Sequence, residues 1–179
     1  MPGPIVMTYT EDHYFEVLWN RSAHAFTRLV KLEPSVMLGV DFSTWWDWDF
    51  PRCLWNHYRS LWCTRYAQDA GIKVWPNLNI PLEHHEAWFA PYPRGVYCCV
   101  SMQTNWPERG AYLSAWRTVL ETVQPSGLLF YGVPEQRKGY YDVAMELIPK
   151  VDVVEPIYVR RRRYRAEKTA AKKAASKEE

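Results

Sequence analysis

Apolar and polar positions divide the chain into two alternating kinds of segment. Continuous apolar runs, typical of strands covered on both faces, lie at residues 4–9, 36–42, 72–80, 95–103, 128–133 and 151–159. Between them, apolar residues recur at helical spacing in residues 10–32, 51–70, 107–123 and, more weakly, 135–148. Pro34 and Gly71 end the first two of these helices, and residues 81–94 form a long connection.

This alternation predicts an α/β fold with a mainly parallel sheet of about six strands. The 179 residues fall short of the roughly 200 that a complete eight-fold barrel needs. An open doubly wound sheet and a reduced, barrel-like sheet therefore stay as alternatives. We expect residues 1–159 to form a single α/β domain and residues 160–179 to form a basic tail that is mobile or marginally helical.

The 51–70 segment carries the clearest helical pattern. Its large apolar residues recur about every 3.6 positions, at Leu54, Trp55, Tyr58, Leu61, Trp62 and Tyr66. We expect this stripe to face the core. Removing the Trp62 side chain is then predicted to cost roughly 3–5 kcal/mol, as for other buried large aromatics.

Composition adds an excess of aromatic residues and an uneven charge. The 10 Trp, 12 Tyr and 6 Phe can fill a core or line a site. Residues 160–179 hold five Arg, four Lys and three Glu, a net charge of +6, so the overall +2 leaves −4 for residues 1–159. The tail is thus the candidate for binding nucleic acid, through Arg160, Arg161, Arg162, Arg163 and Arg165. A solvated charge run without a partner is the alternative.

The four cysteines, Cys53, Cys63, Cys98 and Cys99, form no C-x-x-C pair. The first two lie ten residues apart on one predicted helix, about 15 Å, which is too far for a disulfide. The last two should point to opposite faces of a strand. Buried thiols suit a reducing compartment, so we expect a cytoplasmic protein. We expect neither a transmembrane helix nor a secretory signal, and no membrane partner.

Polar residues follow the predicted strands at Asp41 and Ser43, Asn77 and Asn79, Ser101 and Gln103, and Tyr131. Ligands bind at the carboxyl ends of parallel strands, so we expect a site here for a small polar ligand such as a nucleotide or sugar. Asp41 is the catalytic candidate, since a carboxyl leaving a dry strand gains a raised pKa suited to acid–base work. Turn and capping roles are the alternative for all of them.

Other groupings offer weaker chemistry. Three carboxylates can hold a hard cation such as magnesium, although their D-x5-D-x-D spacing matches no metal loop: Asp41, Asp47 and Asp49. Three tryptophans between them can stack on bases or sugars, or fold onto the core: Trp45, Trp46 and Trp48. The cluster of His84, His85 and Glu86 is interpreted as a loop and not as a metal site. No glycine-rich nucleotide loop and no G-x-S-x-G motif occurs.

Four segments carry a resemblance: DFSTWWDWDFPRCLWNHYRSLW (41–62), GIKVWPNLNI (71–80), GVYCCVSMQT (95–104) and SGLLFYGVPE (126–135). In them the chain resembles the uncharacterised domain-of-unknown-function family numbered 4417, found in phages, plasmids and bacteria. The matching positions are Asp41, Ser43, Pro51, Asn56, Arg59, Gly71, Pro76 and Asn77. The resemblance implies an origin in a mobile element and no particular activity.

Two of these matching residues, Asn56 and Arg59, lie three apart on the predicted 51–70 helix and therefore share one face. That face can look toward the strand ends and contact the ligand, or it can be an exposed helix surface. Two interpretations of function stay open, and the sequence does not decide whether the protein is an enzyme. One is a phage-type protein with a strand-end ligand site, and the other is a non-enzymatic protein that binds nucleic acid or a host protein through its tail and aromatic loops.

Overall fold

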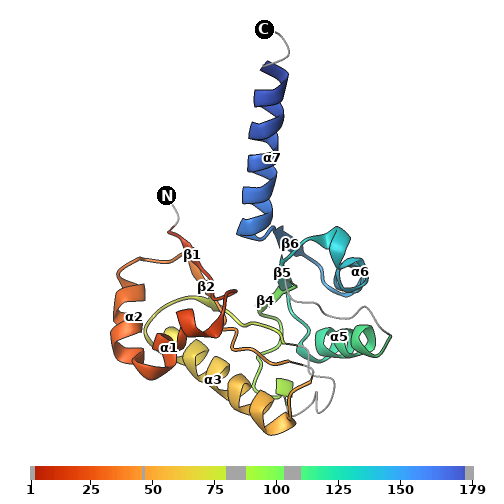
Figure 1. The fold of residues 1–179 in the computed structure, drawn as a ribbon. Helices are drawn as coiled ribbons and strands as arrows, with labels where there is room; N and C mark the ends of the chain where they lie inside the picture. The colour runs from red at the N-terminus through yellow and green to blue at the C-terminus, as the bar shows by residue number, and fades with distance from the viewer. Residues whose placement is uncertain (1–2, 46, 80–87, 103–109, 176–179) are drawn as a thin grey trace.

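The computed structural model describes residues 3–45, 47–79, 88–102 and 110–175 (Figure 1). Within these ranges, six strands form two parallel sheets in sequential order. The first sheet contains β1 (Ile5–Val6), β2 (Val36–Leu38) and β3 (Val74–Trp75). The second contains β4 (Tyr97–Ser101), β5 (Gly127–Tyr131) and β6 (Val151–Val154). A parallel bridge between Asn77 and Cys99 joins the two sheets, which do not close into a barrel, so the predicted α/β fold is confirmed.

Helices fill most of the connections. The described ones are α1 (Glu16–Asn20), α2 (Ser22–Val30), α3 (Phe50–Asp69), α5 (Gly110–Val123), α6 (Lys138–Leu147) and α7 (Ile157–Ala175), with 3₁₀ turns at Asp12–Tyr14 and Pro134–Gln136. The longest, α3, begins at Asp49, whose carboxylate accepts the Arg52 N–H at 3.3 Å. It is followed by Gly71 at a positive φ of 84°, as predicted for a helix end.

Apart from α7, the described helices cover one face of the combined sheet. Met37 packs against residues of α1, α2 and α3, whereas its neighbour Leu38 points to the opposite face. In β4, Cys98 packs against α5 and α6, and Cys99 lies with Leu38 on the opposite face, which confirms the predicted split of the two thiols. A sequential strand order with helices on one face matches the barrel-like alternative and not the doubly wound one.

The sheet is strongly curved. Tyr9 follows β1 and Tyr131 ends β5, yet their ring centroids lie 4.9 Å apart. In a flat sheet, four strand spacings would separate these positions by about 19 Å. The face without helices is therefore concave, and it is filled by side chains from every strand or its extension, namely Tyr9, Leu38, Trp75, Tyr97, Cys99, Leu129 and Val154.

The orientation of α3 differs from the prediction. Trp55 and Tyr58 of the apolar stripe are 52% and 50% exposed, and Trp62 is only half-buried beside Trp19. The buried face instead carries small and polar residues, which are Asn56, His57, Ser60, Cys63, Thr64 and Ala67. The prediction that the aromatic stripe faces the core is wrong for Trp55 and Tyr58, whereas Trp62 and Tyr66 at its edge pack against the core that contains Met37. The polar residues are buried instead because they bond to the chain that follows β2.

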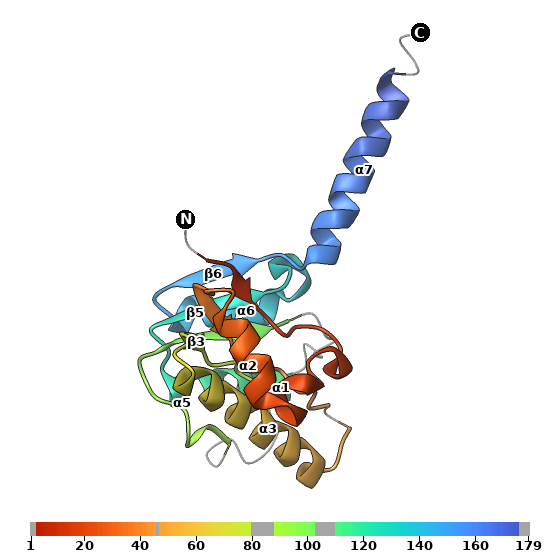
Figure 2. The same ribbon diagram turned by 90° about the vertical axis from the view of Figure 1, so that its left-hand side faces the viewer.

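The end of the last strand also differs from the prediction. The last strand ends at Val154, and residues 157–159 begin α7, because the Pro156 carbonyl accepts the N–H groups of Val159 and Arg160. The tail is a helix as far as Ala175, and it projects away from the body in both views (Figures 1 and 2). No described helix combines the length and apolar character needed to cross a membrane.

Two buried residues come from the predicted long connection at residues 81–94. Trp88 and Phe89 are each 2% exposed and belong to the core beneath α5 and α6. His57 stacks on Trp88 with ring centroids 4.1 Å apart, and its Nε2 lies 3.0 Å from the Trp88 carbonyl. The connection therefore helps to fix α3 against the second sheet.

Candidate functional site

Asp41 lies at the carboxyl end of the first sheet and contacts an amide that follows β3. Asn77 Nδ2 donates to Asp41 Oδ1 at 2.8 Å and to Asn79 Oδ1 at 2.9 Å. Asn77 Oδ1 accepts from the Tyr9 hydroxyl at 2.9 Å. These bonds agree on one orientation of the Asn77 amide, with its NH₂ toward Asp41. We call Tyr9, Asp41, Asn77 and Asn79 the Asp41 cluster.

The environment of Asp41 favours its neutral form. Asp41 keeps part of its surface accessible, but a dense shell of protein surrounds the carboxyl. This burial is the main cause that raises its pKa from 3.8 to about 7, with the negative charge of Asp12 adding to it. Hydrogen bonds from Asn77 and Asn79 act in the opposite direction. A carboxyl with a pKa near neutrality can both accept and release a proton at physiological pH.

Three other titratable groups near Asp41, the Tyr9 and Tyr92 hydroxyls and the Cys99 thiol, stay neutral. Burial raises the pKa of Tyr9 well above its usual value, so its hydroxyl remains a donor to Asn77. Burial likewise raises the pKa of the Cys99 thiol. The Tyr92 hydroxyl donates to the Asn77 carbonyl at 2.7 Å, and burial raises its pKa too. Among these groups, Asp41 is therefore the one that titrates near pH 7.

Close backbone packing sets the distance between the ends of β2 and β3. Gly39 donates its N–H to the Trp75 carbonyl at 2.7 Å. A Cβ at Gly39 would lie 2.5 Å from the backbone nitrogen of Asn77, which is shorter than a van der Waals contact allows. Glycine at this position therefore lets the chain carrying Asp41 approach the chain carrying Asn77.

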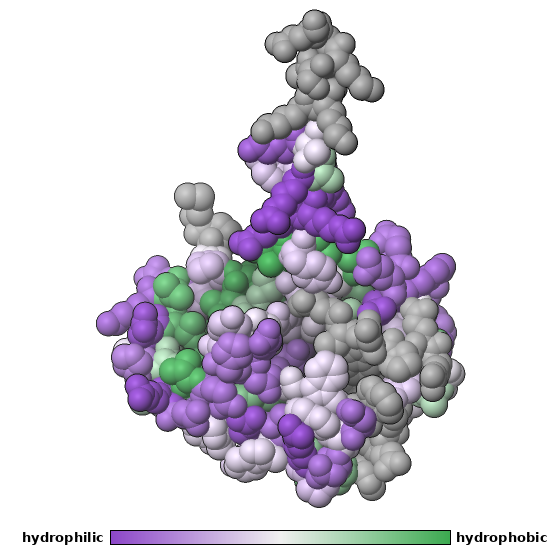
Figure 3. Space-filling model, viewed as in Figure 1, coloured by the Kyte–Doolittle hydropathy of each residue, from purple (hydrophilic) through white to green (hydrophobic). Residues whose placement is uncertain are grey.

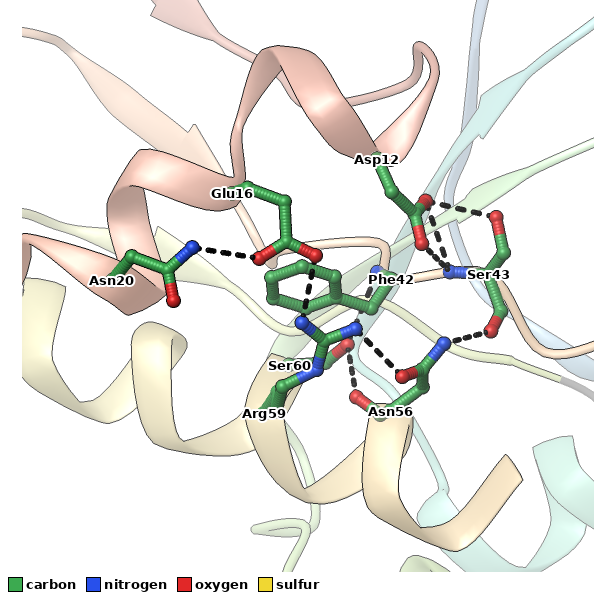
Figure 4. Close-up of polar contacts among 8 residues, drawn as sticks. All are labelled: Asp12, Glu16, Asn20, Phe42, Ser43, Asn56, Arg59 and Ser60. Carbon is green, nitrogen blue, oxygen red and sulfur yellow. Dashed lines mark hydrogen bonds and ion pairs between the residues drawn. The ribbon is translucent and has the colours of Figure 1, made fainter. Parts of the chain in front are cut away.

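A second polar network holds the residues that follow Asp41 (Figure 4). Asp12 accepts the Ser43 hydroxyl at 2.8 Å and the Ser43 N–H at 3.2 Å. Asn56 Nδ2 donates to the Ser43 carbonyl at 2.6 Å. Arg59 donates to Asn56 Oδ1 at 2.7 Å and to Glu16 at 2.8 Å, with its guanidinium 3.9 Å from the centre of the Phe42 ring. The network ties α1 and α3 to the segment after β2.

After β2 ends, side chains on the buried face of α3 accept the backbone N–H groups that a neighbouring strand would otherwise bond. Val40 and Phe42 donate their N–H groups to Thr64 Oγ1 at 3.3 Å and to Ser60 Oγ at 3.2 Å. These acceptors lie four residues apart, on one face of the helix. On the other side, the Asp41 N–H bonds to Thr8 Oγ1 at 3.1 Å. The backbone that carries Asp41 is thus held from both sides.

The structure sorts the predicted site residues into groups. Asp41, Asn77 and Asn79 bond to one another, whereas Ser43, Asn56 and Arg59 are engaged in the network beside them. Ser101 and Tyr131 are register partners at the ends of β4 and β5. Outside the described residues lie Gln103, Trp46, His84, His85 and Glu86.

The carboxylates predicted as a magnesium site do not converge. Within the described ranges, no group of three or more His, Cys, Asp or Glu side chains is arranged to hold a metal ion. Asp49 instead caps α3. Of the tryptophans in the same loop, Trp45 is exposed, and the Trp48 ring lies under the Arg52 guanidinium at 3.4 Å.

Four residues that bond directly to Asp41, Ser43 or Asn77 were not predicted from the sequence. Thr8 and Tyr9 follow the first strand, so the strand-end rule that selects Asp41 could have found them. Asp12 and Tyr92 lie in connections and carry no such signal, since only the folded chain brings them to Ser43 and Asn77.

Residues 2–148 match the model of a family described as "Domain of unknown function (DUF4417)". The chain belongs to this family. This confirms the resemblance carried by the segments at 41–62 and 71–80, and the family match includes the whole of the Asp41 cluster.

Two proteins of mycobacterial phages are among the relatives of this chain. The chain is 28% identical over 134 residues to the Gene 1 protein of Mycobacterium phage D29, covering 73% of this chain and 49% of the relative. It is 27% identical over 134 residues to the Gene 1 protein of Mycobacterium phage L5, covering 73% and 58%. The chain thus spans about half the length of these curated relatives. No solved structure matches it significantly.

Proposed function

We propose that the Asp41 cluster binds a small polar ligand, such as a nucleotide or a sugar, and that Asp41 exchanges a proton with it. The observation that carries this proposal is a partly accessible carboxyl that is fixed by Asn77 at the strand ends of a parallel sheet. Its pKa of about 7 matches the requirement of a general acid or base that works at neutral pH.

The neighbouring groups suit a ligand that carries hydroxyl or amide groups. Tyr9 and Asp41 are the partly accessible members of the cluster, and the Tyr9 ring stacks on the buried ring of Tyr131, while the buried Asn79 bonds to Asn77. Aromatic rings beside polar groups are typical of sites for bases and sugars. Ser43, Asn56 and Arg59 act in this proposal mainly by holding the backbone after Asp41, because their polar atoms are already bonded within the protein.

The location that we propose is the cytoplasm of a phage host. The relatives from mycobacterial phages support a mobile-element origin. The four cysteines are free thiols, and three of them are buried, which suits a reducing compartment.

A ligand screen at two pH values tests the proposal. Nucleoside monophosphates and monosaccharides are added to the full chain at pH 6 and pH 8, and the unfolding temperature is measured. A ligand present at a hundredfold excess over its Kd stabilises the folded state by about 2.7 kcal/mol, which is readily detected. We expect at least one probe to stabilise the wild type, with an affinity that changes as the pH passes 7.

Two matched variants complete the screen. Asp41→Asn keeps the shape and the bond to Asn77 but removes the titration, so the pH dependence of binding should disappear. Asp47→Asn makes the same change on an exposed carboxylate in the neighbouring loop and should bind as the wild type does. A probe whose binding and pH dependence are the same in Asp41→Asn and the wild type would overturn the proposal. A panel without any binder at either pH would also overturn it.

A further inference from the structure

The helix α7 concentrates positive charge outside the body of the protein. Between Ile157 and Thr169 every side chain but that of Val159 is exposed, and this stretch holds five Arg, one Lys and one Glu. Strongly hydrophilic side chains surround the base of the helix, where it leaves the body (Figure 3). Residues 1–159 carry a net charge of −4, so the body and the helix that follows it differ in sign.

Most of these cations have no acidic partner. Arg163 forms an ion pair with Glu155 at 2.5 Å. The other five belong to no ion pair between described residues, and they are Arg160, Arg161, Arg162, Arg165 and Lys168. Among the described residues of the body, counter-charge is supplied only to Arg163, so the rest are available to an external anion.

The positions of the free cations define two sides of the helix. At about 100° per residue, Arg161, Arg165 and Lys168 fall on one stripe, spaced like i, i+4 and i+7. Arg160 and Arg162 lie about 200° apart and flank that stripe. The helix therefore presents cations over more than half of its circumference, and a partner with phosphates on two sides matches this pattern better than a single charged strand.

Double-stranded DNA has that geometry. Its major groove is about 12 Å wide and bordered by two phosphate backbones, and a helix with side chains is about 10–12 Å across. The major groove of an RNA duplex is deep and narrow, so it does not admit the helix in this way. A membrane surface is disfavoured, because an interfacial helix needs a continuous apolar face and α7 has none beyond Ile157, Tyr158, Val159 and Tyr164.

We propose that α7 binds double-stranded DNA in the major groove through Arg160, Arg161, Arg162, Arg165 and Lys168. The guanidinium groups contact phosphate oxygens on both sides of the groove, so binding does not depend on base sequence. The acidic body stays outside the groove, since like charges keep it away from the phosphates.

Fluorescence anisotropy with a random-sequence duplex, measured over a series of salt concentrations, tests this proposal on the full chain. The triple variant R161Q/R162Q/R165Q removes three charges and keeps good helix-forming residues. Each lost phosphate contact should lower the slope of log K against log salt by about 0.9, so the triple variant should lose roughly 2.7 of the wild-type slope. Circular dichroism checks that its helix content is unchanged.

Three further variants separate the contributions. R28Q/K31Q/K73Q makes the same change in net charge on exposed residues of the body and should keep the wild-type slope. R161K/R162K/R165K keeps the charges and should also keep the slope. Asp41→Asn should bind DNA as the wild type does, which separates this proposal from the one for the Asp41 cluster.

Several outcomes would overturn the proposal. An equal slope for the wild type and R161Q/R162Q/R165Q would remove the role of the arginines. Equal or tighter binding to single-stranded DNA of the same length would remove the role of the groove. Binding to anionic phosphatidylserine vesicles without binding to DNA would assign the helix to a lipid surface instead.

Discussion

The two halves of the sheet are held together by different means. Strands β4, β5 and β6 have four or five residues each and pair along nearly their whole length. Strands β1, β2 and β3 have only two or three residues, and side chains take over where their ladder ends. Thr8, Ser60 and Thr64 accept the N–H groups that a neighbouring strand would otherwise accept.

The second half of the sheet therefore contributes mainly to stability, and the first half provides the environment that changes the chemistry of Asp41. The second half encloses an apolar core built around Trp116, Phe130 and Tyr140, which are fully buried. The first half buries polar groups close to a carboxyl, and that arrangement perturbs the pKa of Asp41. A backbone held by side chains can carry an oriented charge at its end, whereas a regular ladder above an apolar core mainly resists unfolding.

Removing a large side chain from the apolar half should have the largest effect on stability. Trp116 is 0% exposed, and its Nε1–H donates to the Tyr140 carbonyl at 3.0 Å. Trp116→Ala should lower the free energy of unfolding by roughly 3–5 kcal/mol. Trp55→Ala, on the exposed face of α3, should cost less than about 1 kcal/mol, and the half-buried Trp62 should fall between the two.

Denaturant unfolding of the three alanine variants measures these values. A loss for Trp55→Ala as large as that for Trp116→Ala would contradict the comparison, because it would show that the aromatic face of α3 is part of the core.

The polar half should reveal itself in the pH dependence of stability. The pKa of Asp41 is about 7 in the folded protein, above the value of 3.8 for an exposed carboxyl. The folded state therefore binds the proton more tightly, so this stabilisation is fully present below pH 4 and is lost as the pH rises through 7. The wild type should lose about 4 kcal/mol over this range relative to Asp41→Asn.

His57 changes the stability in the opposite direction as the pH is varied. Burial lowers the pKa of His57 from 6.5 to about 4, so its contribution is present above pH 6.5 and is lost as the pH falls toward 4. The wild type and Asp41→Asn both contain His57, so its effect cancels when their stabilities are compared. Urea unfolding at pH 4, 6 and 8 gives the difference, and parallel pH curves for the wild type and Asp41→Asn would contradict the raised pKa.

The hydrogen bonds from α3 should have the smallest effect of the three. Thr64→Ala leaves the buried Val40 N–H without its acceptor, at an expected cost of about 1–3 kcal/mol. Ser60→Ala does the same to Phe42. Thr27→Ala is a matched control, since that hydroxyl is exposed on α2 and bonds only to the Ala23 carbonyl. It should change stability by less than about 0.5 kcal/mol, and equal losses for Thr27 and Thr64 would contradict a special role for α3.

The order of strands and helices, and the position of Asp41 at a strand end, could be predicted from the sequence because both follow from local periodicity. The orientation of α3 could not, since its two faces carry the same helical period. Large aromatic residues mark one face, but Asn56, Ser60 and Thr64 lie on the other and gain hydrogen bonds only inside the fold. The periodicity therefore predicts the helix and not the face that it buries.

The site itself was predictable only in part, for the same reason. Asp41 and Asn77 follow strands, and the general rule for parallel sheets selects them. Asp12 reaches Ser43 across 31 positions of the chain, and Tyr9 reaches Asn77 across 68. Such contacts depend on the curvature of the sheet, which no local pattern encodes.

The joint between the two sheets links the integrity of the site to the cooperativity of folding. The joint consists of the bridge between Asn77 and Cys99, with bonds from Leu78 N–H to the Cys99 carbonyl and from Cys99 N–H to the Pro76 carbonyl. Asn77 thus lies at the joint between the two sheets and also orients Asp41. If one half opens before the other, this joint separates first and the Asp41 carboxyl loses its hydrogen bond from Asn77. In native-state hydrogen exchange, the amides of Leu78 and Cys99 would therefore report how long the site survives when the rest of the fold begins to open.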